Sequence, residues 1–135
     1  MRLSEAIREG SKQSYQCFNV SRTYDGGACA MSAARDGLGL SVFDIMPQEI
    51  KDIIGSPQHE CPLCQCVVSV GGCIVHLNDR HRMTREAIAE WVEVQENKMP
   101  QYQPKPVEVV GTPNTLETEV PIEPKPVGVT ECVPA

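Results

Sequence analysis

The sequence predicts a small α+β domain followed by a disordered C-terminal tail. Three observations lead to this fold class: short amphipathic segments bounded by glycine or proline, a dense group of cysteines and histidines between residues 61 and 81, and an abrupt rise in proline after residue 99. A chain of 135 residues supports one hydrophobic core, and with 4% aromatic residues that core has few large side chains. We therefore expect one compact domain that needs a cross-link to hold its shape.

Three short helices are predicted in the N-terminal part, over residues 3–9, 28–38 and 47–54. In each segment apolar residues recur at helical spacing and glycine or proline follows the run. The second segment is rich in alanine and should pack closely against a neighbour. Residues 11–27 alternate poorly, so a loop and a short hairpin both remain open there.

The clearest helix is predicted after Thr84, a residue type that favours the N-cap position. Ile88, Trp91 and Val92 fall on one stripe of this helix, and its glutamates lie largely on other faces. It should pack against the rest of the domain through that stripe.

The group of cysteines and histidines has the ligand order of a tetrahedral zinc site. Cys61 and Cys64 are separated by two residues, which lets both sulfurs reach one ion, and His76 and His81 follow after an apolar segment. Thiolate and imidazole are ligands that Zn²⁺ favours. We therefore predict Zn²⁺ bound by Cys61, Cys64, His76 and His81.

The segment between the two ligand pairs is predicted to be a β-hairpin. Valines flank Gly71-Gly72, a dipeptide that permits positive φ in a tight turn. With the histidines on the helical or turn segment that follows, this arrangement gives a ββα-like zinc-binding unit. The eleven residues between Cys64 and His76 also come close to the spacing of a two-cysteine, two-histidine finger.

Two further cysteines leave the identity of the ligands open. Cys66 and Cys73 lie in the same segment, so either could replace a histidine as a ligand. The alternative without metal is a pair of buried thiols and two surface histidines.

The last third of the chain differs from the rest in composition. Residues 100–135 contain eight of the eleven prolines and lack a periodic apolar face, so we expect a disordered tail with polyproline character. The predicted organisation is therefore an N-terminal part of short helices over residues 1–57, a zinc-binding unit over residues 58–99 in the same compact domain, and the tail.

The motifs CPLC, HLNDRH and TREAIAEWV resemble, in this order, a segment shared by small, uncharacterised zinc-finger-like proteins of tailed phages and prophages. The phrases LSEAIREG and GGACAMSAARDGLG resemble the N-terminal parts of the same group, so the likeness covers most of residues 1–95. Met83 departs from the tryptophan common in that group. The resemblance implies a zinc-finger-like fold and a phage setting, without an established activity.

Charge and cysteine usage narrow the classes of function. A net charge of -6 argues against a protein that binds nucleic acid by neutralising phosphates over a broad surface. Seven cysteines, an odd number, and an N-terminus without a cleavable apolar segment favour a reducing compartment, which for a phage protein is the cytoplasm of a bacterial host. No apolar run is long enough to cross a bilayer, so we expect no membrane association.

The expected function is a non-catalytic interaction module, with a host or phage protein as partner slightly favoured over nucleic acid. Arg80, Arg82 and Arg85 surround the second histidine and could contact phosphates or a partner, unless they pair with neighbouring acidic residues. The alternatives are a DNA-binding regulator and a structural virion or assembly component.

A metal-dependent nuclease of the ββα-metal type is a further alternative, on the basis of His76, Asn78, Asp79 and His81. If Zn²⁺ binds both histidines, however, no general base is left. The CPLC pair lacks the strand and helix that surround a thiol-disulfide redox site.

Overall fold

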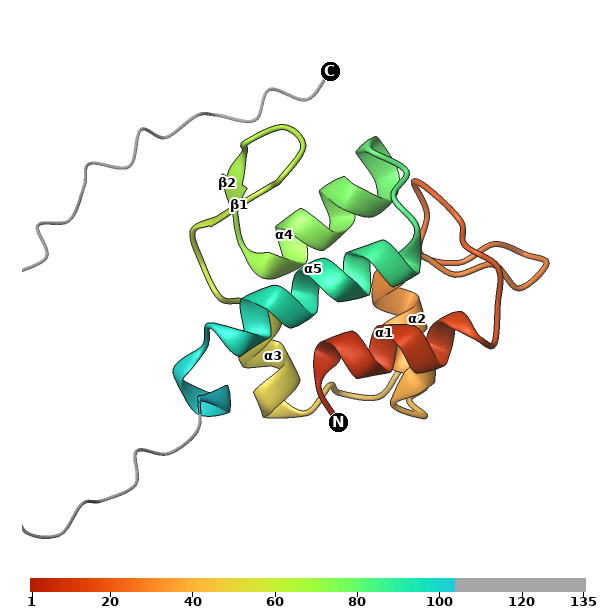
Figure 1. Ribbon diagram of the computed structural model, residues 1–135. Coiled ribbons are helices and arrows are strands. Elements are labelled where there is room, and N and C mark those ends of the chain that lie inside the picture. The colour runs from red at the N-terminus through yellow and green to blue at the C-terminus, as the bar shows by residue number, and fades with distance from the viewer. Residues whose placement is uncertain (104–135) are drawn as a thin grey trace, which may run out of the picture.

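Residues 1–103, the part of the chain that the computed structural model describes, form five α-helices and a two-stranded antiparallel sheet (Figure 1). The helices are α1 (Leu3–Ser11), α2 (Ala30–Gly37), α3 (Gln48–Ile54), α4 (Val70–Val75) and α5 (Arg85–Asn97). The strands are β1 (His59–Glu60) and β2 (Val67–Val68). A π-helix, η1 (His76–Arg80), continues α4, and a 3-10 helix, η2 (Pro100–Tyr102), follows α5. This is the small α+β fold that the sequence predicts.

Aliphatic side chains from the α-helices share one core, as expected for a chain with few aromatic residues. Trp91 and Tyr102 pack at its edge and are only partly buried. Burial of each large aliphatic side chain contributes about 1.5–3 kcal/mol. The fully buried members include Leu3, Ile7, Ile50, Ile53, Ile74, Leu77, Ile88 and Val92.

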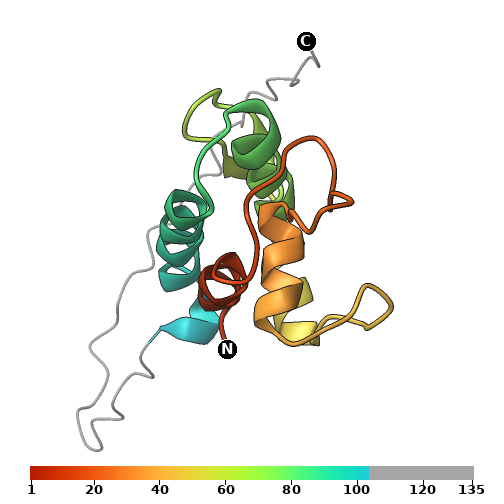
Figure 2. The same ribbon diagram turned by 90° about the vertical axis from the view of Figure 1, so that its right-hand side faces the viewer.

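Helices α1 and α2 lie against each other with their backbones in contact, and Figure 2 shows α1 end-on beside α2. A Cβ atom on Gly10 would lie 1.6 Å from the carbonyl oxygen of Ala33, and one on Gly37 would lie 1.9 Å from that of Ala6. These distances leave room for glycine alone, which confirms the close packing expected of the alanine-rich helix.

The sequence-based helix boundaries differ from α1, α2 and α3 by no more than two residues at either end. The predicted cap of α5 is confirmed, because the Ala87 N–H donates to Oγ1 of Thr84 over 3.2 Å. Capping and apolar periodicity are local signals, so they were readable without knowledge of the tertiary structure.

The predicted hairpin turn at Gly71-Gly72 is wrong, because both glycines lie in α4. The Ser69 hydroxyl accepts from the Gly72 N–H over 3.0 Å and begins the helix as its N-cap. A hairpin exists, but its loop is residues 61–66: His59 pairs with Val68, and Glu60 with Val67. The valines on both sides of the two glycines favour a strand, but the Ser69 N-cap stabilises the first turn of a helix here instead.

The first residues of the predicted tail belong to the described part of the chain. They form η2, where the Arg2 guanidinium lies 4.3 Å from the centroid of the Tyr102 ring, and Met99 just before them is buried. The remainder of the predicted tail, residues 104–135, lies outside the described residues. Among the helices of residues 1–103, none is long and apolar enough to cross a membrane.

Candidate metal centre

The loop between β1 and β2 brings three cysteines into one tight turn. The Cys61 N–H donates to the Cys66 carbonyl over 2.8 Å, and the Gln65 N–H donates to the Cys61 carbonyl over 2.9 Å. Gln65 adopts φ 57°, which folds the chain back on itself. We call residues 61–66 the cysteine loop.

The two histidines are brought to the cysteine loop by the π-helix η1. The His81 N–H donates to the His76 carbonyl over 3.0 Å, so this turn is closed by a bond between residues five apart. At 3.6 residues per turn, an α-helix would direct two such residues about 140° apart. The wider π turn instead lets both imidazoles face the thiols, and π-turns inside helices are frequent at functional sites.

The donor atoms of five residues fall into two groups that share Cys64. One group contains Cys61, Cys64 and His81, and the other contains Cys64, Cys66 and His76; within each, all donor atoms lie within 4.8 Å of one another. The five residues, named here the Cys/His cluster, could hold a metal ion. All four predicted ligands belong to it, and so does the alternative Cys66.

Cys73, the other alternative ligand, lies outside both groups. Its buried Sγ donates to the His59 carbonyl over 3.5 Å. Burial is the main cause that raises the pKa of its thiol to about 12, with smaller contributions from Cys61 and Cys64. A neutral, buried thiol of this kind acts as a small core residue.

One atom of the cluster lacks the hydrogen bond that its burial calls for. Nε2 of His81 is buried and has no hydrogen-bond partner among the described residues. Leaving a buried polar atom unsatisfied costs about 1–3 kcal/mol. His81 has a ring nitrogen within 4.8 Å of the sulfurs of Cys61 and Cys64, and an unprotonated imidazole nitrogen offers the lone pair that a metal ion would accept.

One distance in the cluster fits the size of a zinc site. Sγ of Cys64 and Nδ1 of His76 are 3.7 Å apart. Zn–S bonds of about 2.3 Å and Zn–N bonds of about 2.0 Å in tetrahedral geometry place sulfur and nitrogen about 3.5 Å apart. The pair therefore needs little movement to share one ion.

The electrostatics of the cluster differ from one ligand to the next. Burial raises the pKa of the Cys61 thiol. Burial also acts to raise the pKa of Cys64, but the Cys66 backbone, the Cys61 thiol and the Arg80 side chain together bring it below its usual value. Burial, Arg80 and His81 lower the pKa of His76, which favours the neutral imidazole. A metal ion binds the thiolate and the neutral imidazole.

Asn78 is a buried structural residue that the sequence did not identify as such. Its Oδ1 accepts from the Ala30 N–H over 3.2 Å and from Nε2 of Gln16 over 2.8 Å, and its Nδ2 donates to the Cys17 carbonyl over 3.0 Å and to Asp79 over 2.7 Å. These bonds join η1 to the irregular segment 12–29 and to the start of α2. The sequence held no local signal for this role, because His76, Asp79 and Arg80 around it are polar as well.

The three arginines predicted to form a contact surface have different environments. Arg85 is buried and donates to Oγ of Ser14 over 3.1 Å and to the Ala28 carbonyl over 3.2 Å. Arg82 is exposed and lies over the ring of Phe18, 4.7 Å from its centroid. Arg80 is exposed beside the Cys/His cluster. Only two of the three guanidinium groups are therefore presented at the surface.

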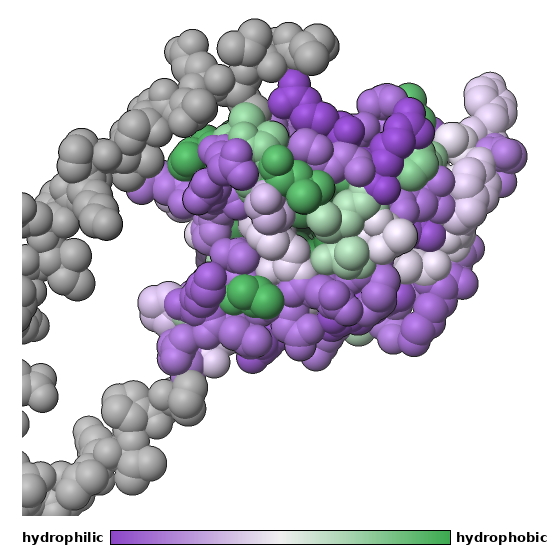
Figure 3. All heavy atoms as spheres, turned by 45° about the horizontal axis from the view of Figure 1, so that its top comes forward, coloured by the Kyte–Doolittle hydropathy of each residue, from purple (hydrophilic) through white to green (hydrophobic). Residues whose placement is uncertain are grey.

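Figure 3 views the molecule with this end brought forward, and its surface there is mostly hydrophilic with apolar residues between the polar ones. The exposed apolar residues of the cysteine loop and α4 are Leu63 and Val75.

Comparison with known proteins found no match among protein-family models, curated proteins or solved structures.

Proposed function

We propose that the chain is a non-catalytic module in which one Zn²⁺, bound by Cys61, Cys64, His76 and His81, stabilises a ββα-like unit that binds another macromolecule. The observation that carries the proposal is the group of Cys61, Cys64 and His81, whose donor atoms lie within 4.8 Å of one another, together with the burial of His81 Nε2 without a hydrogen-bond partner. Zinc is the ion that suits two sulfurs and two imidazoles in a tetrahedral arrangement. Cys66, which shares a donor group with Cys64 and His76, is the alternative ligand in place of a histidine.

A structural role for the ion, rather than a catalytic one, is supported by how the neighbouring side chains are used. A catalytic zinc site keeps one coordination position open for water or substrate. Here four donors are available without Cys66, and the Asn78 amide, which a nuclease would need at its metal, bonds within the fold. These features favour a closed site.

The proposed partner is a protein rather than nucleic acid. With Arg85 used inside the fold, Arg80 and Arg82 are the two remaining members of the predicted basic patch, and the whole chain carries a net charge of -6. Exposed Leu63 and Val75 beside the cluster offer apolar contact area. Following the resemblance of the motifs to phage proteins, we propose a host or phage protein as this partner, in the reducing cytoplasm of a bacterial host.

Metal analysis of the full chain tests the first half of the proposal. We expect one Zn²⁺ per chain, and Co²⁺ substitution should give the sulfur-to-cobalt charge-transfer bands of a two-thiolate site. Cys64→Ser should abolish stoichiometric binding, because Cys64 belongs to both donor groups. Cys29→Ser is the matched control outside the cluster. A wild-type protein without stoichiometric metal would overturn the proposal.

A binding experiment tests the second half. Capture of a partner by the full chain should be lost after chelation and restored by Zn²⁺. In a gel shift with DNA at low salt we expect no binding above that of an acidic control protein. A shift that Arg82→Ala abolishes and Lys12→Ala leaves intact would instead assign the module to nucleic acid.

A further inference from the structure

The loop that connects α2 to α3 exposes three large apolar side chains within four residues. Val42, Phe43 and Ile45 are 58%, 91% and 77% exposed. Single apolar residues at a surface are ordinary, but a contiguous group of them marks a site of interaction. Figure 2 shows this loop, yellow to orange, projecting away from the helices. We refer to residues 41–46 as the apolar loop.

The apolar loop is held in one conformation by its own hydrogen bonds. The Ser41 N–H donates to Oδ2 of Asp44 over 2.7 Å, and the Asp44 N–H donates to the Ser41 carbonyl over 3.1 Å. Nη1 of Arg35, on α2, donates to the Asp44 carbonyl over 2.8 Å. Met46 is buried in the core and fixes the end of the loop. The exposed side chains are therefore presented on an ordered turn, which lowers the entropy lost on binding.

We propose that the apolar loop is a docking element that inserts Phe43, flanked by Val42 and Ile45, into an apolar pocket of a partner protein whose rim carries basic groups. The proposal does not depend on the metal, because the loop and the cysteine loop lie at opposite ends of the molecule (Figures 1 and 2).

The size of the loop favours a concave partner over a second copy of the chain. A stable interface uses about 20–30 residues on each side. Two apolar loops facing each other would supply only six residues each, which is too few. If the Phe43 ring enters a pocket of the partner, the pocket covers it on all sides. Residues buried at the centre of an interface in this way contribute most of the binding energy.

The charges next to the loop favour a protein over a membrane. Three acidic residues, Asp44, Glu49 and Asp52, lie in or just after the loop. The basic residues beside it are two, Lys51 and Arg35, whose guanidinium bonds to the Asp44 carbonyl. Segments that insert into membrane surfaces carry lysine and arginine, which anionic lipids attract. An acidic surround would be repelled by such lipids and attracted by a basic rim.

A photo-reactive phenylalanine analogue at position 43 of the full chain tests the proposal in bacterial cells. We expect adducts with one protein, with the cross-linked peptide in an apolar pocket bordered by lysine or arginine. The purified partner should then bind Phe43→Ser and Ile45→Ser at least about tenfold more weakly than the wild type. Glu49→Lys should also weaken binding. Val94→Ser, at an apolar residue of α5 that is 50% exposed, should change it less than twofold, and Zn²⁺ content should be unchanged in all variants.

Four outcomes would overturn the proposal. The first is the absence of a specific adduct, and the second is a captured protein that binds Phe43→Ser as tightly as the wild type. The third is an adduct with a second copy of the chain, together with concentration-dependent sedimentation as a dimer. The fourth is binding to phosphatidylcholine–phosphatidylglycerol vesicles that Phe43→Ser abolishes.

Discussion

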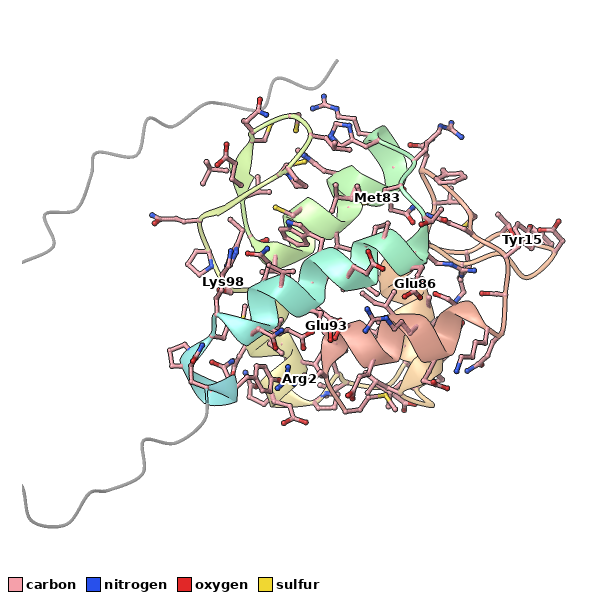
Figure 4. All side chains as sticks on the ribbon, viewed as in Figure 1. Arg2, Tyr15, Met83, Glu86, Glu93 and Lys98 are labelled. Carbon is pink, nitrogen blue, oxygen red and sulfur yellow. The ribbon has the colours of Figure 1, made fainter. Side chains whose placement is uncertain are left out.

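The helical side of the molecule and its cysteine end are stabilised in different ways. On the helical side, α1 contacts α2 backbone to backbone at Gly10 and Gly37. Glu86 and Glu93 of α5 point toward α1 (Figure 4), where Arg8 pairs with both over 3.0 and 2.9 Å. The cysteine end, residues 59–81, joins the core through α4 and η1, but its other part, residues 59–68, has strands of two residues each and an irregular loop.

This difference shows where the chain needs a cross-link. A strand pair of two residues is far below the length that is stable on its own. The buried side chains of the cysteine loop are Cys61 and Cys66, which supply less apolar area than leucine or isoleucine would. The helical side can hold its shape by packing, whereas we expect the strands and loop of the cysteine end to depend on the proposed metal ion.

Removal of the metal should give the largest effect and should separate the two regions. At free Zn²⁺ about 1,000-fold above its Kd, binding stabilises the fold by about 4 kcal/mol, and a chelator should remove that amount. Hydrogen exchange should show lost protection in residues 59–68 and retained protection in α1 and α2. Cys61→Ser should already lack this protection and should not respond to the chelator. Equal loss in both regions would contradict the comparison.

Gly10→Ala should destabilise the helical side without changing metal content. The new Cβ would meet the Ala33 carbonyl oxygen at 1.6 Å, and because a backbone atom cannot move aside easily we expect a loss of about 3 kcal/mol. Urea unfolding of the zinc-loaded protein measures it. Gly55→Ala is the control, since its nearest contact, the Lys51 carbonyl oxygen, lies at 3.2 Å. Similar losses for both variants would refute close backbone packing as the cause.

Asn78→Ala should weaken the connection between the two regions. It leaves the Ala30 N–H and the Cys17 carbonyl without their partner, at a cost of about 2 kcal/mol. Faster hydrogen exchange at the Ala30 N–H would locate the effect. Asn97→Ala, which removes one exposed bond to Arg2, is the control and should cost far less.

Much of this fold was readable from local patterns, and the rest depends on contacts between distant residues. Apolar spacing and the Thr84 cap gave the helices, and the CxxC spacing marked residues that the structure brings together. Asn78 bonds to Ala30 across 48 positions, and no local pattern encodes such a partner. Arg85 was assigned to the surface by its type, yet it bonds to carbonyls of segment 12–29.

The smallest effect is expected from Arg8→Met. Its ion pairs with Glu86 and Glu93 are partly exposed, so we expect a loss of no more than about 1 kcal/mol. The loss should shrink in high salt, because solvent ions screen such pairs. Lys12→Met, which removes a more exposed pair with Glu9, is the control. A loss that is independent of salt would assign the role of Arg8 to the packing of its alkyl chain.

The π turn at His76–Arg80 has a consequence for how this segment can vary in length. Deleting one residue there would restore ordinary winding, and histidines four apart would still share a face of the helix. One π turn of five residues and one α turn of about four both carry the chain round about once, so Thr84 and Arg85 would keep nearly their present direction. A second deletion would have no π turn to absorb it and would rotate everything downstream by about 100°. The segment can therefore lose one residue, but not two, before α5 loses its present neighbours.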